Sequence, residues 1–262
     1  MPFPESNRAL YRRNPLKEVI CQLRFPTILE VTAKSPVQFQ NLVRQRYPFY
    51  TEEKPDLGLP KEVQDILQSL PLSGIQQTPL HKFIVEEKTR FITLSQEFLA
   101  VSELKYERWN NFREEIRCAE QAFRAAYNPS FYSRIGLRYK NFINKKDLGL
   151  ADEAWDTLLN HSLIGVLGVS ELAEEVTETQ SQSLIKLSDI AGGFVRIVHG
   201  LMKTDNSVYV IDADFFIEKK ENLDEAIRTL DQFNQLAARF FNWATSRVLR
   251  DALEPIPDAP SR

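Results

Sequence analysis

The chain has 262 residues, of which 43% are hydrophobic and 26% are charged, and its formal net charge is −3. This is the composition of a globular protein with ample material for a core. Proteins that coat nucleic acid or an anionic membrane are usually far more basic, so any binding of that kind would have to come from a local patch.

The cysteines predict a reducing compartment, and the lengths of the apolar runs predict a soluble protein. Cys21 and Cys118 are the only cysteines and have apolar neighbours in the sequence, which favours buried thiols over a disulfide framework. The N-terminus lacks the apolar segment and cleavage site of a signal peptide. No apolar run approaches the roughly 20 residues that cross a bilayer. We therefore expect a cytoplasmic protein without membrane contact.

The first elements of the chain are predicted to be an arm, a strand and a helix. Residues 1–13 are polar and contain prolines, which indicates an arm on the surface. Residues 17–25 alternate between apolar and polar side chains, which predicts a strand with one buried face. Ser35 and Pro36 suit the start of a helix, whose expected inner stripe is Phe39, Leu42 and Val43.

A three-stranded meander and a long helix complete the first half. Residues 51–80 contain many prolines and predict an excursion over the surface. Residues 81–106 hold three β-rich runs with very short links, which is typical of an antiparallel meander. Residues 109–128 place apolar side chains three and four positions apart, which predicts an amphipathic helix ended by Asn128 and Pro129.

The second half predicts the same order of elements. We expect a strand, a helix and three strands at residues 131–143, 151–165, 171–189, 193–203 and 207–219. A long closing helix then spans 222–253, with an apolar stripe formed by Leu223, Ile227, Leu230, Phe233, Ala237, Phe241, Ala244 and Val248. Residues 255–262 are expected to fray from its end.

The sequence therefore predicts an α+β protein with two similar strand-helix-three-strands-helix halves, residues 1–128 and 129–262, in which an antiparallel sheet is backed by long helices. One continuous sheet with helices on one face is the alternative. The segment "QLRF" at 22–25 aligns with "GLRY" at 136–139, so Arg24 corresponds to Arg138. An arginine at the same place in both halves suggests an ion pair that is repeated with the fold.

Several segments resemble a family of uncharacterised bacterial conserved hypothetical proteins. They are "NPLKEVICQLRFP", "RYPFY", "RIGLRYKNFI" and "LDQFNQLAARFFNWATSRVLRD". Members of this sporadically distributed family are similar in length and open with an Asn-Pro-x-x-Glu strand. The resemblance covers nearly the whole chain and implies a fold and a bacterial origin, but no catalytic residues. At the level of the fold alone, the duplicated order is similar to the TATA-binding-protein saddle, which is weak support for a function.

No catalytic or metal-binding motif is assembled in the sequence. The three histidines, His81, His161 and His199, belong to no HxH, HExxH or CxxC arrangement. For His199, in a predicted strand, a hydrogen-bonded structural role is favoured over catalysis. There is no GxSxG or GxxxxGK[ST] segment. We therefore expect no cofactor and lean against an enzyme.

Asp212 and Asp214 form the most prominent acidic pair, because strand alternation puts both on one face. Two such carboxylates could hold a magnesium ion for phosphoryl transfer. The simpler interpretation is ion pairing across strands, with Arg138 or Arg196 as partners. We favour the ion pairs.

The most basic stretch, "RIGLRYKNFINKK" at 134–146, carries the candidate binding site. Alternation places Tyr132, Arg134, Arg138 and Lys140 on one face, together with Gly136 and Phe142. Rings and cations of this kind suit single-stranded nucleic acid, and Gly136 would let a ligand approach closely. The same face suits an acidic protein partner. An internal charge ladder with Asp212 and Asp214 needs no ligand and ranks first.

The sequence leads to three functional hypotheses. The first is a non-enzymatic binding module in the bacterial cytoplasm, with a protein partner or a second copy of the chain on the open sheet face. The second is nucleic-acid binding by that face. The third is a magnesium-dependent enzyme that uses Asp212 and Asp214.

Overall fold

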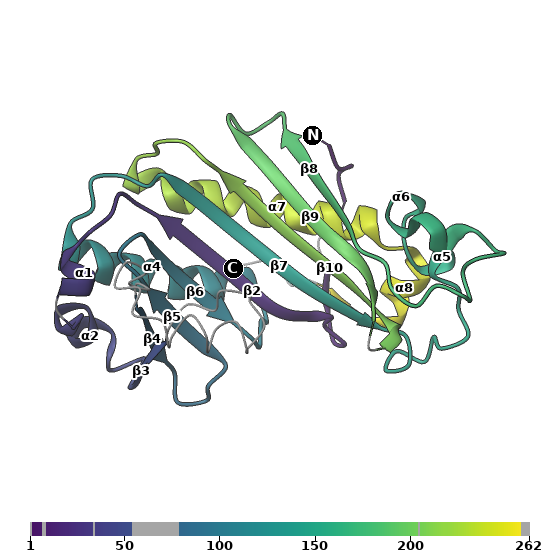
Figure 1. The fold of residues 1–262 in the computed structure, drawn as a ribbon, viewed down its shortest axis with the longest axis horizontal. Helices are drawn as coiled ribbons and strands as arrows, with labels where there is room; N and C mark the ends of the chain where they lie inside the picture. Colours follow the sequence, from purple (N-terminus) through teal and green to yellow (C-terminus); the bar gives the residue numbers. More distant parts are fainter. Residues whose placement is uncertain (1, 7–8, 34, 54–78, 204, 258–262) are drawn as a thin grey trace, which may run out of the picture.

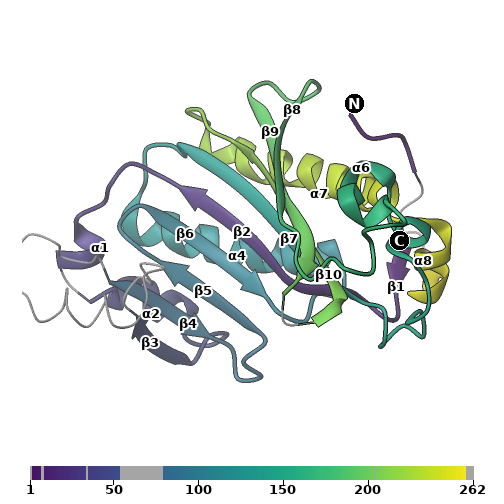
Figure 2. The same cartoon turned by 45° about the vertical axis from the view of Figure 1, so that its right-hand side comes forward.

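A nine-stranded antiparallel sheet dominates the structure, a computed structural model that describes all residues except 1, 7–8, 34, 54–78, 204 and 258–262 (Figure 1). The strand order is β3-β4-β5-β6-β2-β7-β10-β9-β8 (Figure 2). The strands are β2 (Leu16–Arg24), β3 (Phe49–Glu53), β4 (Leu80–Ile84), β5 (Arg90–Leu94), β6 (Phe98–Glu103), β7 (Arg134–Asn144), β8 (Ser181–Leu187), β9 (Gly193–Met202) and β10 (Asp205–Ile217).

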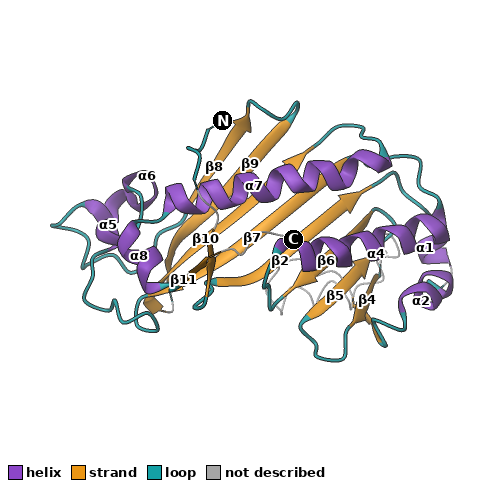
Figure 3. Cartoon of the chain, turned by 180° about the vertical axis from the view of Figure 1, so that it is seen from behind, coloured by secondary structure: helices purple, strands orange, loops and turns teal. Residues whose placement is uncertain are grey.

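Two long helices lie across one face of this sheet, α4 (Trp109–Tyr127) and α7 (Ala226–Ala244) (Figure 3). Short helices flank the two ends of the sheet: α1 (Glu30–Ala33), α2 (Val37–Val43), α5 (Trp155–Leu158), α6 (His161–Ile164) and α8 (Arg247–Ala252), with the 3-10 turns η1 (Gly165–Gly168) and η2 (Leu223–Glu225). This arrangement confirms the predicted α+β fold, with an antiparallel sheet backed by long helices.

The two halves meet at the pairing of β2 with β7. In the first half β2 pairs with the last meander strand, β6, and in the second half β7 pairs with the last strand, β10. From this centre the strands of the first half follow in the order β6, β5, β4, and those of the second half in the order β10, β9, β8. Among the described strands, only the first half has a further strand, β3, at its edge. The sheet is therefore continuous through both halves. The structure contains one sheet with helices on one face, and each half of the chain contributes one side of that sheet.

The core lies between the sheet and the two long helices. Side chains that alternate along the central strands are almost completely buried there: Val19, Cys21, Leu23, Ile135, Leu137, Ile211, Ala213 and Phe215. They pack against α4 and α7, for example through the ring contacts of Phe215 with Phe233 and Phe240. Asp231 joins the two helices, since it accepts hydrogen bonds from Trp109 (2.7 Å) and Arg113 (2.9 Å).

Three predicted elements differ from the structure. The closing helix is interrupted, because Ser246 accepts a hydrogen bond from the backbone of Leu249 (3.2 Å) and begins the separate helix α8. Leu249 is buried there, whereas Val248 is exposed. In α2, Leu42 is exposed and Ser35 forms no side-chain cap. The strand predicted at 171–189 is confined to β8.

The two ends of the described chain are held together by a second, two-stranded sheet. Strand β1 (Ala9–Tyr11) pairs antiparallel with β11 (Pro255–Pro257). Nearby, Phe3 is buried against the rings of Phe240 (5.1 Å) and Trp243 (5.6 Å). The arm is therefore packed in place, and residues 255–257 do not fray as predicted. Most of the predicted 51–80 excursion lies outside the described residues.

Candidate functional site

The candidate site lies on the sheet face opposite α4 and α7, which is called the outer face below and is turned toward the viewer in Figure 1. Arg134, Gly136, Arg138 and Lys140 of β7 point to this face, because the intervening residues of the strand are buried on the helix side. The neighbouring strands β2 and β10 contribute the residues that lie opposite them.

A charge ladder crosses the outer face from β2 to β10. Arg134 contacts Asp214 (2.7 Å), and Arg138 donates through Nε to Asp212 (2.7 Å) and through Nη2 to the same carboxylate. On the other side of β7, Lys140 contacts Glu18 (2.7 Å). Three cations are therefore matched by three carboxylates. This is the ladder that the sequence placed first, although Asp214 is taken by Arg134 rather than by Arg138 or Arg196.

Arg134 fills the space above Gly136. A side chain on Gly136 would overlap the Arg134 guanidinium, which also lies over the ring of Phe216 (4.7 Å to the centroid). A second bond from Arg134 reaches Gln22 (3.1 Å). The expectation that Gly136 admits a ligand is therefore wrong, since the glycine makes room for a side chain of the protein itself.

The electrostatics of the ladder reflect burial and pairing together. The pKa of the Arg138 guanidinium is raised, chiefly by its hydrogen bonds with Asp212 and against the effect of burial. Burial raises the pKa of the Asp214 carboxyl, while the charges of Arg134, Arg138 and Arg196 lower it. Arg138 remains the most accessible cation of the three, with 42% of its side chain exposed.

Tyr132 does not lie on the outer face. Its side chain is fully buried, and its hydroxyl donates to Glu120 of α4 (2.9 Å). The residue precedes β7 and forms an isolated bridge with Glu221, so strand alternation does not extend to it. The predicted grouping of Tyr132 with Arg134, Arg138 and Lys140 is therefore wrong in this one member.

Asp212 and Asp214 do share a face, and each has an arginine partner within hydrogen-bonding distance. In the described part of the chain, no group of three or more His, Cys, Asp or Glu side chains is arranged to hold a metal ion. Arginines next to both carboxylates would repel a divalent cation. The favoured interpretation as ion pairs is confirmed, and magnesium binding stays a prediction.

Beyond the ladder, β8 and β9 present apolar and basic side chains that the sequence pattern alone did not single out. This set, called the outer patch, consists of Leu184, Lys186, Phe194, Arg196 and Val198. Leu184 is 56% exposed, and Lys186 and Arg196 are also exposed. Neither cation forms a salt bridge within 4.0 Å in the described part of the chain. The signal in the sequence was the alternation of Phe194, Arg196 and Val198 with buried residues.

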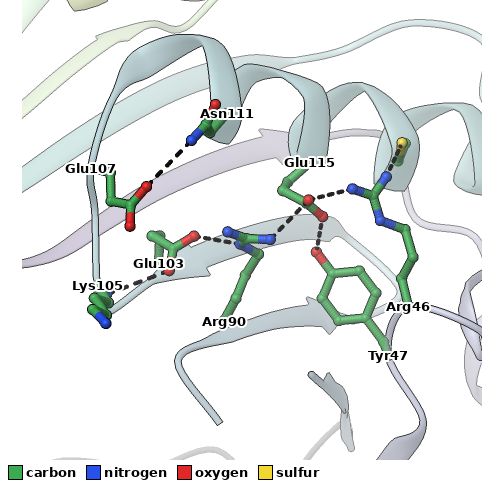
Figure 4. Close-up of polar contacts among 9 residues, drawn as sticks. Arg46, Tyr47, Arg90, Glu103, Lys105, Glu107, Asn111 and Glu115 are labelled. Carbon is green, nitrogen blue, oxygen red and sulfur yellow. Dashed lines mark hydrogen bonds and ion pairs between the residues drawn. The ribbon is translucent and has the colours of Figure 1, made fainter. Parts of the chain in front are cut away.

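A second polar cluster lies on the helix side, where it fixes α4 to the sheet (Figure 4). Arg90 of β5 bridges Glu103 and Glu115, the latter at 2.8 Å. Glu115 of α4 also accepts from Arg46 (2.5 Å) and from the hydroxyl of Tyr47 (2.9 Å). Both carboxylates are almost fully buried, and burial raises the pKa of the Glu103 carboxyl. Every group is paired, so the cluster is structural.

His199 has the hydrogen-bonded role that the sequence favoured. Its Nδ1 lies 2.8 Å from the hydroxyl of Tyr209, and that hydroxyl donates to the backbone oxygen of Leu163 (2.6 Å). The single hydroxyl proton is thereby used, so Nδ1 must be the donor to Tyr209. Burial lowers the pKa of His199, which keeps the ring neutral and structural.

No family model and no curated protein matches the sequence. Among solved structures, the duplicated taurocyamine kinase from Schistosoma mansoni, with bound transition-state-analogue components, matches with a TM-score of 0.40 and 10% identity. The alignment covers 91% of this chain and 32% of the kinase chain, so this chain spans about a third of that protein. In the described residues, no helix has the length and apolarity required to span a membrane.

Proposed function

We propose that this protein is a non-enzymatic binding module of the bacterial cytoplasm and that its outer face receives a protein partner. The observation that supports this is the outer patch, where the exposed Leu184 and the half-buried Phe194 and Val198 lie beside cations that have no salt bridge in the described residues. Interfaces are enriched in aromatic residues and arginine, both of which occur in this patch. The bacterial setting rests on the family resemblance of the sequence.

The chemistry of the patch defines the partner. Phe194 and Leu184 offer apolar contact area, and Arg196 and Lys186 lie beside them. A protein segment with apolar side chains next to carboxylates would bury the former and pair with the latter. At the border of the patch, Arg138 is exposed enough to reach such a segment. A second copy of this chain is the other candidate for the partner.

The test is affinity capture from bacterial extract with four variants of the full chain. Phe194→Glu, Arg196→Glu and Arg138→Glu alter the outer face. The matched control is Arg228→Glu, the same charge reversal at an exposed position of α7. We expect a captured protein that the control retains and that the outer-face variants lose. The purified partner should then crosslink to β8 or β9.

The proposal is overturned if folded outer-face variants retain all captured proteins. Sedimentation of the pure chain over a range of concentrations separates self-association from a different partner. A dimer that is lost in Phe194→Glu and kept in Arg228→Glu would identify the partner as a second copy.

Nucleic-acid binding by the same face is the second candidate. Its support is Arg196 and Lys186, since the cations of the ladder are already matched by carboxylates. Fluorescence anisotropy with single- and double-stranded oligonucleotides would detect it. A phosphate-contacting site weakens steeply as salt rises, so the absence of binding at low salt would exclude this candidate.

Magnesium-dependent phosphoryl transfer is the third candidate, and it would require Asp212 and Asp214 to leave their arginines. Calorimetric titration with magnesium and manganese, compared with Asp214→Asn, decides the matter. Equal heats for the two proteins would exclude a metal site at this pair.

A further inference from the structure

A pocket on the helix side of the sheet lies apart from the outer face and is called the arm pocket here. Its walls are strand β1 and the first residues of β2, the loop before α4, and α7, and its floor is formed by β7 and β10. The space, with its open mouth, measures about 730 Å³. That figure includes open solvent at the mouth, and the centre of a water molecule can occupy about 90 Å³ of it. Since one water needs roughly 10–15 Å³ on this measure, the arm pocket has room for a small molecule of several non-hydrogen atoms.

Three buried polar side chains line this pocket. They are Tyr139 and Asn141 of β7 and Asn234 of α7, and all are more than nine-tenths buried. The hydroxyl of Tyr139 donates to Asn234 (3.0 Å). Asn141 interrupts an otherwise apolar stripe that contains Leu137 and Ile143. Polar groups in an apolar interior destabilise the fold unless they find partners.

Asn141 has hydrogen-bonding capacity left over. Within the described part of the chain its side chain makes a single hydrogen bond, a long one to the backbone oxygen of Ile211 (3.4 Å). An asparagine amide can donate twice and accept twice. Because this amide lines the pocket, its remaining capacity is available to a molecule inside. A buried, under-used amide beside a cavity is the feature expected of a binding site that recognises a polar group.

The walls select the shape of the ligand. The rings of Tyr11 and Phe241 lie 5.7 Å apart at one side, and Tyr106 meets Tyr139 edge-on at 6.1 Å. Alanines provide the space between them, since Ala213 and Ala238 line the pocket where larger side chains would fill it. Flat aromatic surfaces stack well on other rings, so a planar molecule fits these walls.

The charge of the lining selects the ligand further. Glu107 is the one formally charged residue among the described lining residues, and none of them is a lysine or arginine. An anion would lose its hydration there without gaining a cationic partner. We infer that the arm pocket is a binding site for a neutral, planar heteroaromatic molecule, whose ring stacks between the aromatic walls and whose polar edge bonds to Asn141.

The test uses ligand-observed NMR on the full chain with four probes: indole, nicotinamide, adenine and, as an anion of similar size, benzoate. Saturation transfer should reach at least one neutral heterocycle and should not reach benzoate. Ala238→Phe fills the pocket from a half-buried position of α7. Asn141→Leu removes the polar contact. Each variant should weaken the binding of the neutral probe at least tenfold.

Val198→Phe, on the outer face, is the matched control and should bind the neutral probe as the unmodified chain does. Circular dichroism establishes that each variant is folded, and Ala238→Phe keeps the test decisive if Asn141→Leu fails to fold. The inference is overturned if no neutral probe binds, if benzoate binds equally well, or if Ala238→Phe binds unchanged. None of these outcomes depends on a partner at the outer face.

Discussion

Gln22 lies directly opposite Gly136 in the pairing of β2 with β7, and these are the residues that correspond when the two halves are aligned. When two corresponding strands pair antiparallel, a residue lies opposite the equivalent residue of the other strand only where the twofold axis passes. The pseudo-twofold axis of the sheet therefore passes between Gln22 and Gly136. Arg24 and Arg138, two residues further along each strand, both pair with the last strand region of their own half, at Glu97 (3.8 Å) and Asp212 (2.7 Å). Both arginines are therefore ion-paired, but the pair is not repeated by the symmetry, because Glu97 precedes β6 whereas Asp212 lies within β10 opposite Lys140.

Gly136→Ala should destabilise the protein, although alanine normally suits a strand better than glycine. The new methyl group would displace the Arg134 guanidinium from Asp214 and Phe216. We expect a loss of about 1–2 kcal/mol in the free energy of unfolding, the range for a disturbed buried contact, measured by urea denaturation. In an Arg134→Ala background the same substitution should stabilise the protein by about 0.5 kcal/mol, because only the backbone preference remains. Equal destabilisation in both backgrounds would contradict this account of the glycine.

The ion pairs of the two corresponding arginines, Arg24 and Arg138, should differ in strength. Arg138→Ala leaves Asp212, whose side chain is 14% exposed, without its donors, and should lower the free energy of unfolding by about 1–3 kcal/mol. Arg24 and Glu97 are both 48% exposed, so Arg24→Ala should change it by less than about 1 kcal/mol. Thermal unfolding of both variants, with Arg138→Ala/Asp212→Ala to complete a double-mutant cycle, measures the difference. Equal effects at the two sites would mean that burial does not set the strength of these pairs.

Glu115→Ala should destabilise the protein more than Arg24→Ala or Arg138→Ala. It leaves Arg46, Arg90 and Tyr47 without their shared acceptor. Breaking a buried ion pair by removing one partner costs about 3–5 kcal/mol, so we expect a loss of that size in urea unfolding. Tyr47→Phe removes one bond only and should cost about 0.5–1.5 kcal/mol. Glu114→Ala on the exposed side of α4 is the control, and a comparable loss there would refute the role of the cluster.

His199 should make the protein less stable in mild acid. Burial holds its folded pKa below the unfolded value of about 6.5, so the unfolded chain binds more protons once the pH falls below that value. Its stabilising contribution is present above pH 6.5 and is lost as the pH falls toward the lower, folded pKa. His199→Gln should reduce the slope of unfolding free energy against pH by up to about 1.4 kcal/mol per unit. The exposed His161→Gln serves as the control, and an unchanged slope for His199→Gln would rule out this contribution.

The sequence was informative wherever side-chain periodicity is strong. Alternation along 134–143 identified both faces of β7, and the spacing of residues 109–128 identified α4 almost to its ends. Periodicity could not reveal the break before α8, because the apolar spacing continues through Ser246 while the side chain of that serine starts a new helix. It also misplaced Tyr132, which precedes the strand and bonds to a helix.

The arm pocket is formed by segments that are far apart in the sequence, so no local sequence pattern could predict it, whereas the charge ladder could be predicted. The ladder was foreseeable because Arg138, Asp212 and Asp214 carry opposite charges on neighbouring strands. The arm pocket was not, since strand β1 has three residues and its partner β11 is at the other end of the chain. Asn141 was visible as an interruption of an apolar stripe, but Asn234 comes to line the same pocket only through the docking of α7.

The pairing of β1 with β11 has a consequence for protein synthesis. Among the described strands, β1 leaves the ribosome first and β11 last. The central strand β2 can pair with β6 and β7 while translation continues, whereas β1 must wait for β11, its partner among the described strands. One wall of the arm pocket therefore closes only after β11 has been synthesised, so occupancy of the pocket would report that β1 and β11 have paired.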